Sequence, residues 1–505
     1  MGHRIKEFGD FQTSDDLADE ILQYLLREGV KPQTIIEPTC GKGSFVRSAL
    51  RYFPNTKIIA RDINRKYIAG IKSDLGENAK LDIKVADFFK VPWTRIIKKA
   101  APPVLIVGNP PWVTAADMGV MEGNNIPQRS NFAGYAGLDA ITGKSNFDIS
   151  EWMSIELLKA LGGKYGTFAM ICKASVARRV FEFLAKSSVW VQSASFCIID
   201  TKRHFNVSTV AGVFICTIKP GFRTNTCRVL RGLENGPLVQ EIGYIDQTLV
   251  ADISLYQKYS YLKGAGIYSW RSGIKHDCAS IMELELRDGH LFNGLEEEVK
   301  IEDTYLFPLL KSSDIANKRT TSTRKFMLVT QTFIGEDTRK IANTAPMTWE
   351  YLMTHQELFD GRKSRIYKGK PQFAIFGVGS YTFSPWKVAI SGMYKHLTFE
   401  LISPLYSKPV VLDDTCYFIP ARSREEASIL QHLYMHFKVQ GFYRSLIFWD
   451  SKRPIKKEVL QQLDPRNLVK EIGLEQILQG INAKSPTLDQ DKVRNALSSV
   501  IGYHA

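Results

Sequence analysis

One tetrapeptide in the N-terminal half of the chain has the residue types needed to hold an amino group. Asn109, Pro110, Pro111 and Trp112 directly follow an apolar run at residues 104–108. Each proline restricts its own φ angle and biases the preceding residue away from the helical region, so we expect a stiff loop. Such a loop can aim the Asn109 carboxamide oxygen and the Pro110 carbonyl at one exocyclic amino group. Trp112 then offers a flat surface for stacking, although a plain proline-rich turn is the alternative interpretation.

A second candidate site is the strand-to-helix turn at residues 34–45. An apolar run leads into a turn with two glycines, which allow the backbone to approach a bound molecule, and then into a helical pattern with unpaired N–H groups. The spacing G-x-G lacks the third glycine of the dinucleotide fingerprint, and GKS lacks the rest of the phosphate-loop pattern. An ordinary turn therefore remains an alternative. The candidate ligand-binding residues here are Glu37, Pro38, Cys40 and Gly41.

Two further strand ends carry acidic residues. Asp62, followed by Ile63, ends the run at residues 57–61, where a carboxylate can accept hydrogen bonds from both hydroxyls of a ribose. Asp87 and Phe88 follow the next run and offer an acceptor and an aromatic wall for an adenine ring. Singly, each acidic residue is more often a solvated loop residue or a helix cap. Three consecutive strand ends with ligand-type residues together favour a binding site.

These candidates need a sheet that brings the strand ends together. The first half of the chain alternates apolar, strand-like runs with helical patterns, which is typical of an α/β domain with a largely parallel sheet. Residues 301–450 favour mixed, mostly β structure, and residues 456–497 again have a helical pattern. We predict strands at residues 34–37, 57–61, 82–85, 104–107, 167–172 and 210–218 and helices at residues 15–26 and 152–161. Ser14 or Asp15 can cap the first helix.

With these motifs the sequence resembles the amino-group DNA methyltransferases that use S-adenosylmethionine, specifically the adenine-N6 group in which the cofactor motifs precede the catalytic loop. Residues 37–45 resemble the cofactor loop, Asp62 the ribose-binding acid, and Asp87 with Phe88 the adenine-binding pair. Residues 109–112 match the catalytic loop, whose fourth position is usually aromatic. The resemblance implies S-adenosylmethionine as the cofactor and requires no metal.

Other parts of the resemblance are less close. Residues 11–14, which include Thr13 as a cofactor contact, are similar to the family's N-terminal cofactor segment, but Ser14 stands where the family usually has proline. Residues 204–209 look like the segment whose aromatic residue stacks on the extruded base, which makes Phe205 the candidate. Residues 146–148 fall where another cofactor-lining segment is expected.

The resemblance covers residues 8–220 and implies a Rossmann-like class I methyltransferase domain. We place this catalytic domain at residues 1–225 and a connecting region at residues 226–300. The family also leads us to expect a target-recognition domain, which we place at residues 301–505 as a mixed α+β structure.

The charge of the chain favours a polyanionic partner. Lys and Arg number 66 against 52 Asp and Glu, so the net charge is +14, and the surplus is denser in residues 301–505. Basic runs can neutralise the phosphates of double-stranded DNA, although a solvated basic face is an equal alternative. The candidate run contains Arg362, Lys363, Arg365, Lys368 and Lys370, and a second contains Lys318, Arg319, Arg324 and Lys325.

The remaining composition narrows the class of protein. The seven cysteines lack any C-x-x-C spacing, so we expect neither disulfides nor a structural metal. No apolar run is long enough to span a membrane, and the first residues lack the apolar core of a secretory signal, so we expect a cytoplasmic protein without a membrane partner.

Several alternatives stay open at this stage. A related loop can act on cytosine N4, on adenine in RNA or on a protein glutamine amide, and a non-catalytic DNA-specificity subunit could retain the same fold. The cofactor motifs begin almost at residue 8, so we expect any restriction endonuclease to be encoded separately rather than fused in front of them.

Overall fold

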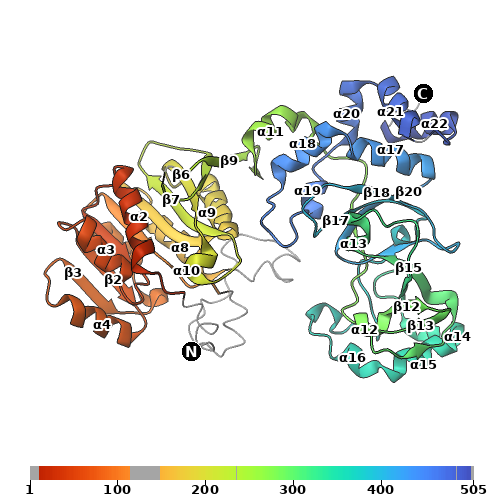
Figure 1. Ribbon diagram of the computed structural model, residues 1–505, viewed down its shortest axis with the longest axis horizontal. Coiled ribbons are helices and arrows are strands. Elements are labelled where there is room, and N and C mark those ends of the chain that lie inside the picture. Colours follow the sequence, from red (N-terminus) through yellow and green to blue (C-terminus); the bar gives the residue numbers. More distant parts are fainter. Residues whose placement is uncertain (1–10, 114–147, 235, 485, 502–505) are drawn as a thin grey trace. The chain divides into compact units, whose positions relative to one another are not determined.

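A computed structural model describes residues 11–113, 148–234, 236–484 and 486–501 of the chain (Figure 1). The chain forms two compact units, Met1–Ile253 and Ser254–Ala505. Each unit has its own sheets and its own buried apolar core.

The first unit is built on a ten-stranded sheet in the order β3-β2-β1-β4-β5-β7-β6-β8-β9-β10. Strands β1 to β5 all pair in parallel, whereas β7 runs antiparallel to both of its neighbours, β5 and β6. The first seven strands are β1 Thr34–Glu37, β2 Lys57–Asp62, β3 Leu81–Val85, β4 Val104–Gly108, β5 Gly166–Lys173, β6 Val191–Ile198 and β7 Ala211–Ile218. The predicted Rossmann-like α/β fold is confirmed, and the six predicted strands match β1 to β5 and β7 to within one residue at each end.

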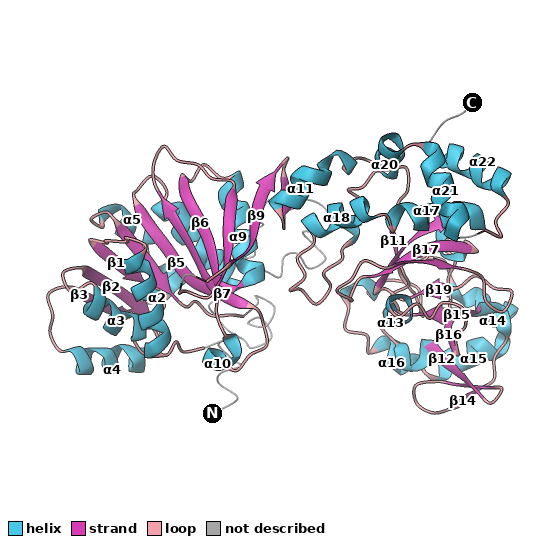
Figure 2. Cartoon of the chain, turned by 45° about the horizontal axis from the view of Figure 1, so that its top comes forward, coloured by secondary structure: helices cyan, strands magenta, loops and turns pink. Residues whose placement is uncertain are grey.

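Helices cover both faces of this sheet (Figure 2). On one face lie α2 Asp15–Arg27, α3 Ser44–Tyr52, α4 Arg65–Leu75 and the short α10 Thr201–Phe205. On the other lie α5 Trp93–Lys99 and α9 Ala174–Lys186, and α8 Ile149–Leu161 packs against both of them. The Ser14 side chain caps α2 by accepting a hydrogen bond from the Leu17 amide. Because both faces are covered, β1 and β4 are buried along their whole length.

The sheet extends beyond the limit expected at residue 225. Strands β8 Thr226–Arg231, β9 Leu238–Ile245 and β10 Thr248–Val250 continue it past β6. Residues 226–250, which the sequence analysis assigned to a connecting region, are therefore part of the first unit, and the chain after Ile253 belongs to the second.

The second unit is a mixed α+β structure with two sheets. One has the strand order β14-β13-β12-β16-β15-β19 and the other the order β11-β20-β17-β18. The strands are β11 Arg271–Ser272, β12 Glu283–Arg287, β13 His290–Phe292, β14 Glu298–Val299, β15 Leu306–Leu310, β16 Lys325–Leu328, β17 Trp386–Ser391, β18 Phe399–Ile402, β19 Val411–Leu412 and β20 Cys416–Ala421.

The helices of the second unit are distributed along the whole segment. They are α11 Ile253–Tyr259, α12 Ala279–Met282, α13 Ser312–Ala316, α14 Ile341–Thr344, α15 Pro346–Thr354, α16 Gln356–Asp360, α17 Arg424–Tyr434, α18 Phe437–Leu446, α19 Lys457–Leu460, α20 Pro465–Ile472, α21 Leu474–Lys484 and α22 Gln490–Ile501. The expectation of mostly β structure in residues 301–450 was wrong, because α13 to α18 lie in that range. Most of these helices are short, so they show little helical periodicity.

Within the described residues, no helix is long and apolar enough to cross a membrane. The same parts of the chain hold no group of three or more His, Cys, Asp or Glu residues that could bind a metal ion.

Candidate functional site

Three predicted residues meet at one edge of the parallel sheet. Glu37 is the last residue of β1, Asp62 is the last residue of β2, and Asn109 follows β4 directly. Because β1 lies between β2 and β4 and all three strands are parallel, their carboxyl ends lie at the same edge. This is where open α/β sheets bind ligands.

The turn after β1 is shaped around the Asp62 carboxylate. The Gly41 amide donates to one Asp62 oxygen at 2.8 Å, and the Asn64 amide donates to the other, also at 2.8 Å. Gly41 has φ of +51°, and a Cβ there would lie 2.5 Å from the Gln12 side-chain oxygen. A larger residue would therefore be strained by its conformation and would displace Gln12. The Asp62 carboxylate therefore holds the turn that contains Gly41.

The segment before α2 closes over this turn. The Gln12 side-chain oxygen accepts from the Lys42 amide at 3.0 Å, and the Thr13 carbonyl accepts from the Ser44 hydroxyl at 2.8 Å. Thr13, a predicted cofactor residue, thus contacts the turn through its backbone carbonyl. Gln12 was not among the predicted site residues. Its position next to Thr13 in the sequence could have indicated it.

Glu37 is a buried acid at the carboxyl end of β1. Its side chain is 2% exposed, and its Oε2 atom has no hydrogen-bond partner among the described residues. Burial, followed by the nearby Asp62 carboxylate, raises the pKa of Glu37 well above its usual value. An unpaired polar atom at a strand end is costly, so it marks a place where a ligand can donate a hydrogen bond.

Pro38 and Cys40 are buried parts of the same turn. The Cys40 amide donates to the Arg61 carbonyl at 2.9 Å. Burial raises the pKa of the Cys40 thiol far above its usual value, so the thiolate that a nucleophile requires is disfavoured. Cys40 therefore acts as a packing residue beside the site.

The strand ends of β2 and β3 differ in whether their apolar side chains are exposed. Ile63 is 55% exposed and presents an apolar surface beside Asp62. Asp87 accepts from the Phe89 amide at 3.1 Å and caps a short turn, while the Phe88 ring is buried against the Trp93 ring, with centroids 5.2 Å apart. Phe88, which the sequence predicts as the wall for an adenine ring, therefore packs inward, whereas Ile63 is exposed.

The Asn109 carboxamide is fixed in one orientation. Its nitrogen donates to the Phe11 carbonyl at 2.7 Å, while its oxygen Oδ1 is buried and has no hydrogen-bond partner among the described residues. The Asn109 carbonyl accepts from the Thr39 hydroxyl at 3.3 Å, which ties the loop to the turn after β1. The anchored nitrogen thus leaves Oδ1 as an open acceptor.

The other end of the loop is held by a lysine that the sequence analysis missed. Lys173, at the end of β5, donates from Nζ to the Trp112 carbonyl at 3.2 Å and forms an ion pair with Asp148 at 2.9 Å. Asp148 is buried and caps α8. Lys173 could have been found from the sequence, because it is a charged residue at the end of an apolar run, as Asp62 is. Residues 146 and 147 of the segment considered with Asp148 lie outside the described residues.

Three aromatic rings lie together beside this loop. Trp112 and Phe205 have centroids 5.3 Å apart with their planes at 63°, and Phe11 lies 5.4 Å from Trp112 and 6.1 Å from Phe205. The structure therefore brings together the two predicted base-stacking residues, which are 93 positions apart, and adds Phe11. The rings are in direct contact, so they must separate before a base can lie between them.

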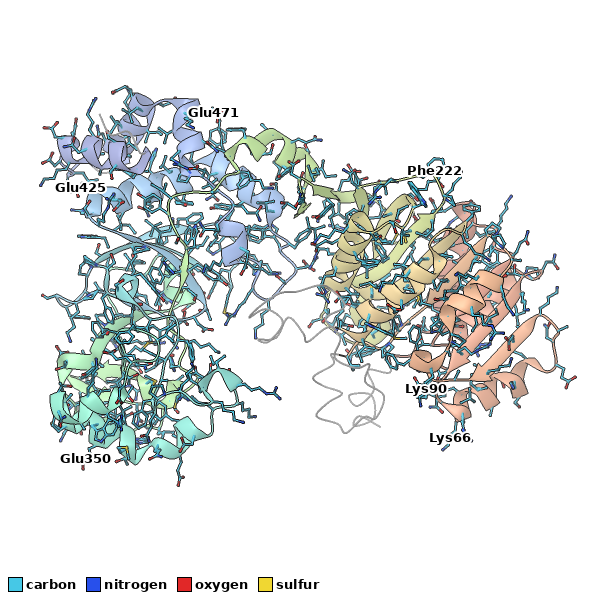
Figure 3. The ribbon with its side chains drawn as sticks, turned by 180° about the vertical axis from the view of Figure 1, so that it is seen from behind. Lys66, Lys90, Phe222, Glu350, Glu425 and Glu471 are labelled. Atoms are coloured by element: carbon cyan, nitrogen blue, oxygen red, sulfur yellow. The ribbon has the colours of Figure 1, made fainter. Side chains whose placement is uncertain are left out.

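The predicted basic run lies in the second unit and is heterogeneous. The Arg362 guanidinium donates to the carbonyls of Phe359, His276 and Ala374 and lies 3.7 Å from the centre of the Tyr367 ring. This residue is part of the packing. The side chains of Lys363, Arg365, Lys368 and Lys370 are exposed. Exposed cations also occur in the first unit, where Figure 3 labels Lys66 and Lys90.

The chain is similar to known methyltransferases in sequence and to a solved restriction-modification enzyme in fold. The chain is 44% identical over 476 residues to the type II methyltransferase M.NspV from Nostoc sp.. The aligned part covers 92% of this chain and 98% of that protein. A shorter match, 27% identical over 138 residues, links 27% of this chain to 25% of the type II methyltransferase M.XamI from Xanthomonas campestris pv. amaranthicola. Among solved structures, the type IIL restriction-modification enzyme MmeI in complex with DNA shares the fold, with a TM-score of 0.51 and 12% identity over 100% of this chain and 73% of that chain. No protein-family profile matches the chain.

Proposed function

The chain belongs to the type II methyltransferases, and from this premise we propose that it transfers a methyl group from S-adenosylmethionine to the N6 amino group of an adenine in double-stranded DNA. The modification would protect a short DNA sequence within a restriction-modification pair, with the endonuclease on a separate chain. One solved structure that shares the fold is a restriction-modification enzyme in complex with DNA, which supports a DNA substrate.

The observation that carries this proposal is the open acceptor of Asn109. Its Oδ1 atom is buried and unpaired among the described residues, whereas its nitrogen is anchored on the Phe11 carbonyl. An adenine N6 amino group has two N–H donors, so Asn109 Oδ1 and the Pro110 carbonyl could each accept one. These hydrogen bonds would favour a more tetrahedral nitrogen and hold it for in-line attack.

The fit of the cofactor rests on the turn after β1. Bound S-adenosylmethionine supplies a methyl group on a positively charged sulfur, which makes that methyl electrophilic. Glu37 Oε2 is the buried acceptor available for a hydroxyl or ammonium donor of the cofactor. Asp62 orders the turn through Gly41, and its carboxylate oxygens retain acceptor capacity for ribose hydroxyls.

The target base must leave the duplex to reach this site. Extrusion costs a few kcal/mol, and stacking on an aromatic ring contributes ~1 to 3 kcal/mol per base. Trp112 and Phe205 are the rings available for this stacking, and they must separate from each other to admit the base. Lys173 keeps the loop in place by holding the Trp112 carbonyl.

The test is to express the chain in a host that lacks DNA methylases and to sequence its DNA by a long-read method that reports base modification. We expect N6-methyladenine at one short sequence, and no such signal with an Asn109→Ala chain. Methylation at cytosine N4 would overturn the adenine assignment. A folded chain that binds S-adenosylmethionine in calorimetry but leaves the DNA unmodified would overturn the DNA substrate and favour an RNA or protein acceptor.

A further inference from the structure

A loop of the second unit exposes two neighbouring apolar side chains. Phe333 is 58% exposed and Ile334 is 50% exposed, whereas Thr330 and Gln331 at the base of the same loop are fully buried. The loop connects β16 with the turn at Thr338–Lys340. Single exposed apolar residues are ordinary, so the surroundings decide whether this pair has a role.

The shape of the loop is set by its own hydrogen bonds. The Thr332 hydroxyl donates to the Glu336 carboxylate at 2.9 Å, and the Thr332 amide donates to the same oxygen. The Glu336 amide donates to the Phe333 carbonyl at 3.2 Å, and Gly335, with φ of +89°, allows the chain to turn. The Phe333 and Ile334 side chains are therefore held outward by a loop that does not need them for its own packing.

The base of the loop is hydrogen-bonded to the segment that follows the exposed cations in sequence. The Thr330 hydroxyl donates to the Phe373 carbonyl at 2.8 Å, and the Gln331 side-chain oxygen accepts from the Ile375 amide at 2.9 Å. These contacts hold the loop against residues 372–375, which directly follow the basic run. Among the described residues, no ion pair involves the exposed cations Lys363, Arg365, Lys368 and Lys370.

We propose that Phe333 and Ile334 form a wedge that enters the base stack of bound duplex DNA, while the four exposed cations hold the neighbouring phosphates. The proposal rests on the DNA substrate of the proposed function. Apolar side chains that enter a base step partly unstack it and kink the duplex, at a cost of a few kcal/mol per step. Lysine and arginine contacts to phosphates offset that cost. The wedge would thereby assist the unstacking that base extrusion requires.

The exposed cations that precede the anchoring segment in sequence favour DNA over other occupants. A protein partner or a second copy of the chain would need a larger apolar surface than two side chains, because stable protein interfaces bury about 1,200 to 2,000 Å². A base step accepts one or two apolar side chains and is flanked by phosphates on both strands. The combination of a small apolar tip and cations that form no ion pair with any described residue fits the duplex.

The experiment compares a double variant, Phe333→Ser with Ile334→Ser, with the wild type on a set of duplexes. Each duplex contains the unmodified sequence that the chain methylates, and each carries one abasic position at a different place. Both kcat/KM for methylation and Kd from fluorescence anisotropy are measured. The matched control is Leu295→Ser, because Leu295 is a 48% exposed apolar residue on another loop of the same unit. A second comparison is Lys363→Ala with Lys368→Ala.

We expect the double wedge variant to lose roughly 10- to 100-fold in kcat/KM on intact duplex, which corresponds to a few kcal/mol of unstacking. The loss should largely disappear when the abasic position coincides with the step that the wedge opens. The lysine variant should weaken binding to all duplexes and reduce the salt dependence of Kd. Leu295→Ser should behave as the wild type.

An equal loss on every duplex, or no loss on any, would overturn the wedge. A change in self-association without a change in DNA binding would overturn it in favour of a contact between chains. If the wild type binds duplex with this pattern but transfers no methyl group, the wedge stands and the proposed reaction fails. Thermal melting of each variant checks that the fold is retained.

Discussion

Two buried glutamates, one in each unit, have opposite chemistry. Glu37 at the end of β1 is 2% exposed, and Glu426 in α17 is 3% exposed. Burial raises the pKa of Glu37 well above its usual value, with the Asp62 carboxylate adding to the effect. Burial also opposes the charge of Glu426, but hydrogen bonds from Arg422 outweigh it, so the pKa of Glu426 lies below its usual value.

The difference lies in the partners that the fold supplies. Arg422 donates to the Glu426 carboxylate at 2.9 Å, and the Tyr268 hydroxyl donates to it at 2.7 Å. Glu37 Oε2 has no partner among the described residues, as is also true of Asn109 Oδ1. A buried acid with partners stabilises the fold, whereas a buried acid without them has acceptor capacity that a ligand can use. Glu426 is therefore a structural ion-pair partner in the second unit, whereas Glu37 belongs to the candidate site of the first.

The largest effect should come from the open acceptor. Asn109→Ala removes it, so we expect kcat for methyl transfer to fall by about 1,000-fold or more, because the interaction acts on the nitrogen during transfer. Incorporation of tritium from labelled cofactor measures the rate, and calorimetry should show cofactor affinity close to that of the wild type. Asn317→Ala, at an exposed asparagine of the second unit, is the matched control. Normal turnover by Asn109→Ala would show that the acceptor has no part in catalysis.

Replacement of Glu37 should weaken the binding of S-adenosylmethionine. Glu37→Gln weakens a charge-assisted hydrogen bond to the cofactor, so we expect Kd for S-adenosylmethionine to rise by roughly 10- to 100-fold. Calorimetry measures the affinity directly. Glu426→Gln should leave it unchanged. Equal affinities for the two variants would remove the functional distinction between the two glutamates.

The partnered acid should instead affect stability. Glu426→Gln leaves the Arg422 guanidinium without a charged partner, and we expect a loss of about 2 kcal/mol in the free energy of unfolding, because Arg422 itself is largely exposed. The midpoint of urea unfolding at neutral pH measures this loss. Glu37→Gln should not lower the midpoint. An unchanged midpoint for Glu426→Gln would mean that the ion pair contributes nothing.

The smallest effect is a difference in pH dependence. Since the pKa of Glu37 is raised in the folded state, its ionisation costs stability as the pH rises above the ordinary glutamate range. We therefore expect Glu37→Gln to melt a few degrees higher than the wild type at pH 8 and at the same temperature near pH 4.

The opposite sign applies to Glu426. Its lowered pKa contributes stability that is present above the ordinary glutamate pKa and is lost as the pH falls through the folded value. The gap between the wild type and Glu426→Gln should therefore shrink on acidification. Melting curves recorded from pH 4 to pH 8 for both variants check the two signs, and parallel curves for the two would contradict the comparison.

Sequence reasoning was most successful where the signal is local. The predicted strand limits hold because apolar runs bounded by turns are properties of adjacent residues. Helices α13 to α18 were missed because most of them are too short to show a helical period. The unit boundary also differed from the expected one, because pairing of β8 with β6 is a long-range contact that no local pattern specifies.

The candidate site shows the same division. The types and spacing of residues 109–112 determined that a stiff loop with an amide and an aromatic ring follows β4, since proline restrictions act on neighbouring residues. Only the tertiary structure decided that Phe11, 98 positions away, takes the Asn109 nitrogen and leaves the oxygen open. It also decided that Arg362 is used in packing and that Glu37 Oε2 has no hydrogen-bond partner in the part of the chain that the structure describes. Hydrogen-bond partners are chosen by packing between distant segments, so composition and spacing alone do not specify them.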